Sequence, residues 1–418
     1  MATTGSEPMA TNGFADSSFL RGQAQSLNDF YLPRSVDIEI GGFIAQIADD
    51  GSVFDRQTRH LVSSCRYANS FALADRYGLG DGEDCLAAAD HGLRFLREAH
   101  RDPVNGGYWW VLSGREPVDR SKQAYGHAFV LLTAATAVAC GLEGRDLLDD
   151  VSEILETRFW REVDGLYVDE ISEDWSIVEP YRGQNANMHM TEAMLAAYAA
   201  TGETFYLDRA ETIARRVAVD LPEQTRGLLW EHYDQGWRAD LLYNKETPFH
   251  LLRPYGVLSG HLLEWAKLLV LLERERPTDW AMPAARCFFT AAIEHAWDGE
   301  YGGFQYAFDL DGSIVDYDKY HWTISEAIGS AVAMLGQTGE PSFRHWYDAS
   351  WQYAIDHQID HYLGGWYPVL TRDGTRKEVA YARGKPDFYH PLGACLLALD
   401  VLTPGDAWNV SAGGAETA

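Results

Sequence analysis

Residues 302–316 read GGFQYAFDLDGSIVD, two glycines and an aromatic run followed by an Asp-Gly step. Asp311-Gly312 suits the positive φ angles of a tight turn, and the short runs around it have the composition of β-strands. Related segments occur five more times: GGFIAQIADDGSVFD (41–55), GGYWWVLSGREPVD (106–119), GLYVDEISEDWS (165–176), GLLWEHYDQGW (227–237) and GGWYPVLTRDGT (364–375). A repeated supersecondary unit buries its apolar face against its neighbours, so the repeat predicts one closed domain.

Between these segments the hydrophobic pattern changes to helical spacing, and in most units a turn interrupts it once. The turns are YGLGDG (77–82), CGLEG (140–144), TGE (201–203), RPTD (276–279) and TGEP (338–341). Each unit is therefore predicted to be helix, turn, helix, hairpin. With a first helix near 19–31 and a last one near 391–402, the pattern predicts twelve helices. We expect an all-α (α/α)6 barrel with short β-hairpins at one mouth.

Composition and length favour a single catalytic domain over residues 16–403. The small polar residues of 1–15 indicate a disordered N-terminal tail, and those of 404–418 a flexible C-terminal tail. No apolar run is long enough for a membrane span, and the N-terminus lacks the pattern of a secretion signal. Five scattered cysteines without CxxC spacing predict reduced thiols in a cytoplasmic protein.

The formal net charge is −28, from 62 acidic and 34 basic residues. Such a chain is a poor partner for nucleic acid, whose phosphates require a basic surface. Only six of the basic residues are lysines. An acidic, lysine-poor surface is typical of salt-adapted proteins. A GC-rich genome, in which arginine displaces lysine, explains the same counts, so both interpretations stay open. We expect a monomer or homodimer.

Polar residues stand at similar places near the starts of the predicted inner helices: Arg66, His127, His189, His261, Thr323 and His390. Three glutamates follow one helical turn later, at Glu192, Glu264 and Glu326. Equivalent positions in a ring of helices point to a common axis. We therefore expect four imidazoles, one guanidinium and three carboxylates to converge at one mouth. Burying so many titratable groups without a use is unfavourable, which indicates a functional site.

Three kinds of chemistry suit this set of residues. His189/Glu192 and His261/Glu264 have the types and spacing of metal ligands, but no HExxH motif is present. Glycoside hydrolysis requires two carboxylates, for which Asp387, Glu264 and Glu326 are candidates. Proton transfer fits the histidines best, because imidazole serves as base or acid near neutral pH. A fixed cation such as Arg66 would stabilise an enediolate formed from an aldose, and aromatic hairpin residues would face a sugar ring.

Several motifs in order resemble the N-acylglucosamine 2-epimerase superfamily from about residue 41 to 402. They are GGYWWVL (106–112), YGHAF (125–129), NANMH (185–189), GHLLEW (260–265) and the Tyr389-His390 pair. The resemblance implies an (α/α)6 barrel and a cis-enediol(ate) mechanism that uses two histidines and no metal or cofactor.

The resemblance also implies roles for individual residues. His390 matches the base that acts at C2, and His261 matches the second histidine, which Glu264 is expected to orient. Substrate contacts are expected from Arg66, Asn185, His189, Trp322, Glu326, Tyr125, His127 and Asp387. Trp322 matches a sugar-stacking position.

The stretch GKPDFYH (384–390) is similar to the branch of mannose and sulfoquinovose-type isomerases. Cellobiose epimerases have a tryptophan-containing segment where this chain has Lys385 and Pro386. We therefore expect an aldose-ketose isomerase acting on the monosaccharides mannose and fructose. A 2-epimerase of the same family is the nearest alternative. Alternatives from other classes are a glycoside hydrolase and a barrel that binds sugar without turnover.

Overall fold

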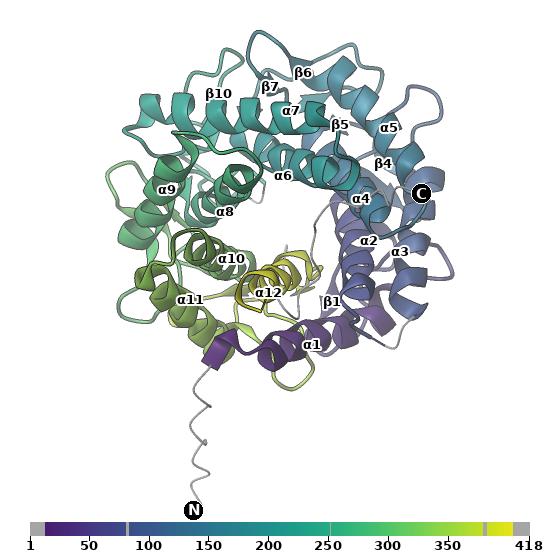
Figure 1. Cartoon of the computed structure of the whole chain (residues 1–418). Coiled ribbons are helices and arrows are strands. Elements are labelled where there is room, and N and C mark those ends of the chain that lie inside the picture. Colours follow the sequence, from purple (N-terminus) through teal and green to yellow (C-terminus); the bar gives the residue numbers. More distant parts are fainter. Residues whose placement is uncertain (1–12, 81–82, 251, 379–382, 404–418) are drawn as a thin grey trace, which may run out of the picture.

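The structure, a computed structural model, describes residues 13–80, 83–250, 252–378 and 383–403. Its described residues contain twelve α-helices in two concentric rings (Figure 1). The inner ring consists of α2 (Leu61–Arg76), α4 (Ala124–Ala139), α6 (Gln184–Thr201), α8 (Ser259–Glu275), α10 (His321–Thr338) and α12 (Tyr389–Leu402). The outer ring consists of α1 (Ser17–Ser35), α3 (Glu83–Phe95), α5 (Arg145–Ile154), α7 (Thr204–Arg215), α9 (Ala281–Ala296) and α11 (Pro341–Tyr353). The predicted (α/α)6 barrel is confirmed.

Sequence composition separates the two rings. The inner helix α4 is rich in alanine, leucine and valine and is buried on nearly all sides. The outer helix α5 buries only Leu147, Leu148 and Val151, which lie on one face. Four outer helices continue into a single π-helical turn: η2 (Leu96–His100), η3 (Leu155–Phe159), η4 (Arg216–Asp220) and η6 (Ala354–Gln358). The 3-10 segments are η1 (Gly13–Ala15) and η5 (Leu221–Thr225).

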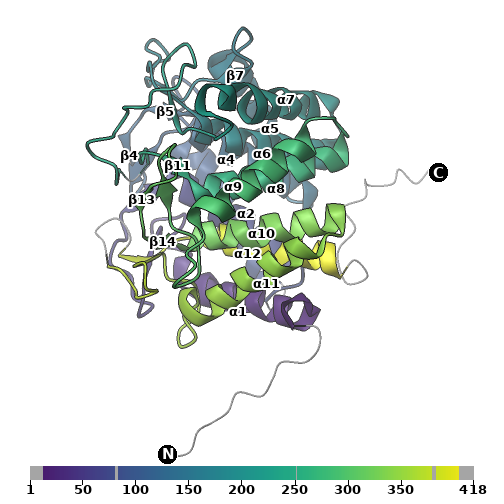
Figure 2. The same cartoon turned by 90° about the vertical axis from the view of Figure 1, so that its left-hand side faces the viewer.

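Small antiparallel sheets lie at one end of the barrel, where Figure 2 shows β4, β5, β11, β13 and β14. Each inner helix follows a short strand: β2 (Thr58–His60), β5 (Lys122–Gln123), β9 (Arg182–Gly183), β11 (Val257–Leu258), β14 (Lys319–Tyr320) and β16 (Gly384–Lys385). Their partners in the same order are β3 (Val111–Ser113), β8 (Glu170–Ile171), β10 (His232–Tyr233), β12 (Ala307–Phe308), β15 (Val369–Leu370) and β1 (Ile47–Ala48). The remaining strands are β4 (Glu116–Asp119), β6 (Trp160–Arg161), β7 (Leu166–Tyr167) and β13 (Ile314–Asp316). The β1–β16 pair joins the first hairpin to the last unit and closes the ring.

A buried ion pair recurs beside these sheets. An aspartate after an outer helix pairs with a cation on the strand that precedes an inner helix. The pairs are Asp37–Arg59 at 2.7 Å, Asp102–Lys122 at 2.9 Å, Asp298–Lys319 at 3.4 Å and Asp360–Lys385 at 2.6 Å. Lys385, noted in the sequence for replacing a tryptophan, therefore anchors the strand that leads to His390.

We expect Asp360→Asn to lower the free energy of unfolding by about 3 to 5 kcal/mol, because it leaves the Lys385 ammonium buried without its countercharge. Lys385 is 0 % exposed. Urea unfolding followed by circular dichroism measures the change. As a control, Asp149→Asn breaks the exposed Arg145–Asp149 pair and should change the value by less than about 0.5 kcal/mol. Equal effects from both substitutions would contradict a structural role for the buried pairs.

The two predicted tails lie mostly outside the described residues, at 1–12 and 404–418. Gly13–Ala15, which the sequence assigned to the N-terminal tail, forms the 3-10 segment η1. The Phe14 carbonyl accepts a hydrogen bond of 2.8 Å from the Tyr347 hydroxyl. Within the described ranges, no helix is both long and apolar enough to cross a lipid bilayer.

Candidate active site

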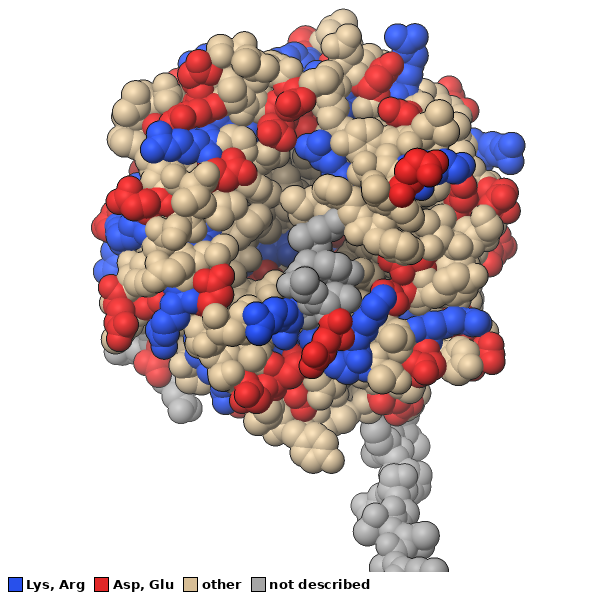
Figure 3. All heavy atoms as spheres, turned by 180° about the vertical axis from the view of Figure 1, so that it is seen from behind, with Lys and Arg blue, Asp and Glu red and all other residues tan. Residues whose placement is uncertain are grey.

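The second and sixth residues of the inner helices face the barrel axis, because a spacing of four residues returns to the same helix face. Tyr125, Asn185, Trp322 and His390 are second residues, and Arg66, His189 and Glu264 are sixth residues. All seven line one cavity of about 450 Å³, which His261 also lines. Figure 3 views the strand-bearing end of the molecule, whose face is hollowed at its centre.

His390 is fixed by a carboxylate behind its ring. Its Nδ1 lies 2.8 Å from Oε1 of Glu326, on the neighbouring helix α10. A carboxylate only accepts, so Nδ1 carries the hydrogen and Nε2 keeps a free lone pair. Nε2 has no hydrogen bond within the described part of the chain, and His390 lines the cavity. This imidazole is oriented to act as a base toward a bound molecule.

His261 is held by Glu231, on the loop that precedes β10, and not by Glu264 as predicted. Its Nδ1 lies 2.9 Å from Oε2 of Glu231. The Gln184 amide donates to the same carboxylate at 2.9 Å and accepts from the Trp265 indole N–H at 2.7 Å. The cavity therefore contains a second histidine whose orientation is fixed by a network of buried polar groups.

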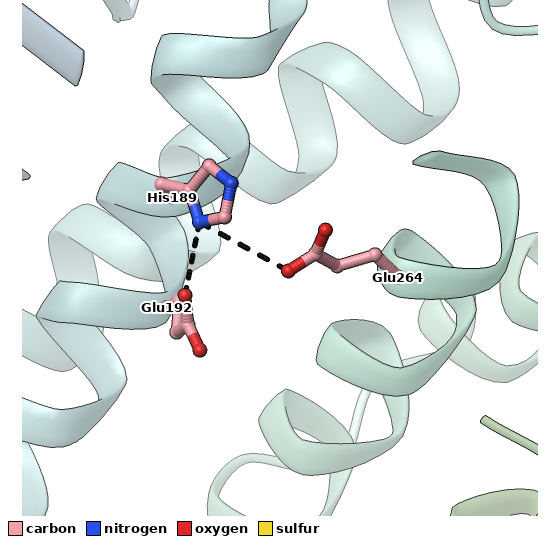
Figure 4. A group of neighbouring side chains, drawn as sticks. All are labelled: His189, Glu192 and Glu264. Atoms are coloured by element: carbon pink, nitrogen blue, oxygen red, sulfur yellow. Dashed lines mark hydrogen bonds and ion pairs between the residues drawn. The ribbon is translucent and has the colours of Figure 1, made fainter. Parts of the chain in front are cut away.

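His189, Glu192 and Glu264 form a third cluster (Figure 4). Nδ1 of His189 donates to Glu192 at 3.0 Å and lies 3.9 Å from Oε1 of Glu264. The Tyr389 hydroxyl donates to the other oxygen of Glu192. Lys267 lies 3.8 Å from Glu264 and donates to Glu326 at 2.5 Å. A lysine ammonium therefore supplies the positive charge between these carboxylates.

His189, Glu192 and Glu264 have the atom types and spacing of metal ligands, as do Glu264, Glu326 and His390. Because Lys267 already compensates Glu264 and Glu326, we expect turnover to be unchanged after dialysis against EDTA. The measurement compares kcat/KM before and after dialysis, with added Mn²⁺, Zn²⁺ or Mg²⁺ in parallel samples. Loss of activity on dialysis and its recovery with one ion would overturn this expectation.

Arg66 packs against two aromatic rings. The group lies 4.6 Å from the Phe129 ring centroid and 4.9 Å from that of Tyr389. Its Nη2 donates to the Tyr125 hydroxyl at 3.2 Å, and its Nη1 lies 3.9 Å from Asp387. These contacts hold a positive charge at the cavity wall in one orientation, as stabilisation of a developing anion requires.

Trp322 lies between the two oriented histidines. Its ring centroid is 5.2 Å from that of His261 and 5.8 Å from that of His390. The indole packs directly on Gly260, where an added Cβ would lie 2.2 Å from the ring. Trp322 lines the cavity, and its role in stacking on a sugar stays a prediction.

We expect Gly260→Ala to displace the Trp322 indole and lower kcat/KM by about 10-fold or more, because overpacking by one methyl group already costs about 1 to 3 kcal/mol. Gly393→Ala is the matched control, since a Cβ at Gly393 meets nothing within 4 Å. The control should keep wild-type activity. Wild-type activity in Gly260→Ala with an intact fold would show that the indole position is unimportant.

Three buried polar atoms on the cavity wall have no hydrogen-bond partner among the described residues. They are Nε of Arg66, Oδ1 of Asn185 and Oε1 of Glu264. An unsatisfied buried polar atom is costly, and native proteins keep few of them. The three atoms are therefore suited to a ligand with several hydroxyl or carbonyl groups.

Burial sets the protonation states in the cavity. It lowers the pKa of His390 well below the usual value near 6.5, and the Arg66 and Lys267 charges lower it further. Burial also lowers the pKa of His189 to about 4. Burial and the neighbouring Glu326 raise the pKa of the Glu264 carboxyl well above its ordinary value. At neutral pH, His390 is therefore a neutral base.

His127, one of the predicted substrate contacts, lies outside the cavity. It is the fourth residue of α4, so it points to the outer ring. Its Nδ1 binds the Gln123 carbonyl at 2.7 Å, and its Nε2 accepts from the Tyr108 amide at 3.2 Å. Asn187, the fourth residue of α6, binds the Tyr167 backbone in the same way. The prediction for His127 was wrong because its helix register differs from that of His189 by two residues.

Two further predicted substrate contacts lie at the edge of the cavity or behind it. Glu326 is 3 % exposed and contacts His390, so it positions the base and does not line the cavity. Asp387 lines an adjoining cavity, which shares Arg66 and Tyr125 with the first. Thr323 is buried and lines neither cavity, although the sequence placed it at the equivalent inward position.

Comparison with known proteins identifies the family. The model of the N-acylglucosamine 2-epimerase (GlcNAc 2-epimerase) family matches residues 42–394. A D-mannose isomerase from Marinomonas mediterranea is 40% identical over 398 residues, which cover 94% of this chain and 100% of that protein. A D-mannose isomerase from Thermobifida fusca is 38% identical and covers 93% of this chain and 96% of its own length.

Solved structures agree with the sequence comparisons. A crystal structure of D-mannose isomerase aligns with a TM-score of 0.89 at 39% identity, covering 94% of this chain and 100% of that one. The cellobiose 2-epimerase of Spirochaeta thermophila aligns with a TM-score of 0.81 at 22% identity, over 93% and 98% of the two chains, which shows a shared fold alone. The chain belongs to the N-acylglucosamine 2-epimerase family.

Proposed function

We propose that this chain is an aldose-ketose isomerase that interconverts D-mannose and D-fructose without a metal or cofactor. The observation that carries the proposal is His390, a neutral imidazole whose Nδ1 is held by Glu326 while Nε2 is free. Arg66 and Trp322 line the same cavity. The 40% and 38% identical relatives are D-mannose isomerases, which supports mannose as the substrate.

The reaction begins with the open-chain aldose in the cavity. Nε2 of His390 takes the proton from C2, and the electrons of that C–H bond form the C1–C2 double bond of an enediolate. The Arg66 guanidinium stabilises the negative charge on oxygen. The hydroxyl proton moves from O2 to O1, and His390 returns its proton to C1 on the same face. The product is the ketose, with no change in total atoms or electrons.

His261 serves ring opening of the bound pyranose in this proposal. Its imidazole is fixed by Glu231 and lies against Trp322, next to the space that a sugar ring would occupy. Asn185, His189 and Glu264 supply hydrogen bonds to the substrate. Tyr125 acts through Arg66, whose guanidinium donates a hydrogen bond to the Tyr125 hydroxyl.

A 2-epimerase that interconverts mannose and glucose is the second candidate. The observation that favours it is the presence of two separately oriented histidines in one cavity. Glycoside hydrolysis fits less well, because Glu231 and Glu326 bind imidazole rings and Glu264 lies 3.9 Å from His189. We further propose a cytoplasmic location, consistent with five free cysteines, and a monomeric or homodimeric state.

Product analysis tests the proposed function. Purified protein is incubated with D-mannose, D-glucose, D-lyxose and D-talose separately, and products are identified by chromatography. Fructose as the main product from mannose supports the isomerase. Glucose as the main product supports the epimerase. No conversion of any of the four sugars would refute the proposed activity.

A further inference from the structure

Lys267 lies on the inner helix α8 and does not line the cavity. Its side chain is 14% exposed, and its Nζ donates to Oε2 of Glu326 at 2.5 Å. The other oxygen of Glu326 accepts from Nδ1 of His390 at 2.8 Å. An ammonium, a carboxylate and an imidazole therefore form one continuous line that ends at the proposed base. Nothing in the sequence motifs pointed to this lysine.

A carboxylate beside a histidine has two effects. It orients the ring through Nδ1, and its negative charge also favours the protonated imidazolium. The second effect is unfavourable for a base, because a ring that already holds a proton cannot accept the one from C2. A cation on the far oxygen of the carboxylate cancels much of that charge and leaves the hydrogen bond in place.

Resting on the proposed function, we propose that Lys267 is a positioning residue that keeps His390 neutral by neutralising Glu326. Lys267 does not line the cavity, so it acts through Glu326 and not on substrate. The geometry assigns Glu326 to orienting the ring and Lys267 to setting the charge of the pair.

Other charged and titratable groups surround this line. Those that act on Lys267 or His390 from α2, α6, α8 and α10 are Arg66, His189, Glu192, Glu264, Glu326 and His321. Burial opposes the Lys267 charge, but Glu326, Glu264 and Glu192 outweigh it and raise its pKa. Arg66 and Lys267 both disfavour a proton on His390. Removing Lys267 leaves burial and Arg66 as the main effects that oppose the carboxylates.

Lys267→Met tests the role through the pH profile of kcat/KM. The free enzyme is active when His390 is neutral, so the acid limb of the profile follows the pKa of His390. Without the ammonium that pKa rises, and we expect the limb to move up by about one pH unit or more. On the acid limb, activity at a given pH should then fall about 10-fold, and it should approach the wild-type value as the pH rises to neutrality. Lys267→Arg should keep the wild-type limb.

Arg145→Met is the matched control, since it removes one positive charge from an exposed site. It should leave the profile unchanged. Lys267→Gln replaces Lys267→Met if the methionine variant does not fold. Reduced activity with an unmoved acid limb in the folded variant would overturn the proposal, because a merely structural role lowers activity at every pH.

A second readout needs no substrate. Two-bond ¹H–¹⁵N spectra of histidine rings report the tautomer and titration of His390, assigned by comparison with His390→Gln. We expect the Lys267→Met ring to hold its second proton at a pH where the wild-type ring is neutral. Identical titrations would overturn the role of Lys267 even if the enzyme isomerises mannose. A shifted titration in a protein that converts no aldose would support Lys267 and refute the proposed function.

Discussion

His390→Ala is expected to lower kcat/KM for mannose by about 10³- to 10⁴-fold, the upper range for loss of a general base. The substitution removes the one ring whose Nδ1 is fixed by Glu326 and whose Nε2 faces the cavity. Arg66 and the cavity itself remain, so a small residual rate is expected. Binding of mannose should weaken far less than turnover, because the base acts mainly in the transition state.

Initial rates of fructose formation across mannose concentrations give kcat and KM for this comparison. His345→Ala on the outer helix α11 is the control, because His345 is exposed and lines neither cavity. It should match the wild-type enzyme. Activity within about 10-fold of wild type in His390→Ala would rule out its role as the base.

Arg66→Met is expected to lower kcat by about 10² to 10³-fold, the effect of removing one donor from an oxyanion site. The charge is lost at the place where the enediolate forms, while the methionine side chain still packs against Phe129 and Tyr389. Arg66→Lys should recover only part of the rate. Its ammonium keeps the charge but lacks the planar group that contacts both rings and reaches Tyr125.

The same assay of fructose formation measures both variants, with circular dichroism to confirm that each is folded. Arg94→Met is the control, since Arg94 is exposed on the outer helix α3. It should leave kcat unchanged. A large rise in KM with kcat preserved would contradict stabilisation of the enediolate and indicate substrate binding alone.

The barrel was predictable from the sequence because each feature of its repeat depends only on residues that are close together in the chain. The Asp-Gly turns, the glycine pairs and the change from strand to helical spacing are each set by neighbouring residues, as at Asp311-Gly312. His189, His390 and Arg66 were expected to face the barrel axis because they stand at similar places near the starts of the predicted inner helices. His127 failed because a shift of two residues turns a side chain from the axis to the outer ring.

The partners of the histidines were less predictable. The family resemblance implied Glu264 as the partner of His261, but Glu231 reaches that ring from the loop of another unit. Glu326 likewise crosses from α10 to His390 on α12. Such contacts depend on the distance between helices and on side-chain rotamers, neither of which leaves a pattern in the sequence. For the same reason, no sequence pattern indicated the contact of Lys267 with Glu326.

Proton exchange in D₂O tests the central claim most directly. Mannose is incubated with the enzyme in D₂O, and the products are followed by NMR. The account predicts fructose carrying one deuterium at C1, or the original C2 hydrogen there if His390 returns it before exchange with solvent. It predicts neither product from His390→Ala on the same time scale. Fructose formed at an undiminished rate by His390→Ala, or no fructose from the wild-type enzyme, would contradict it.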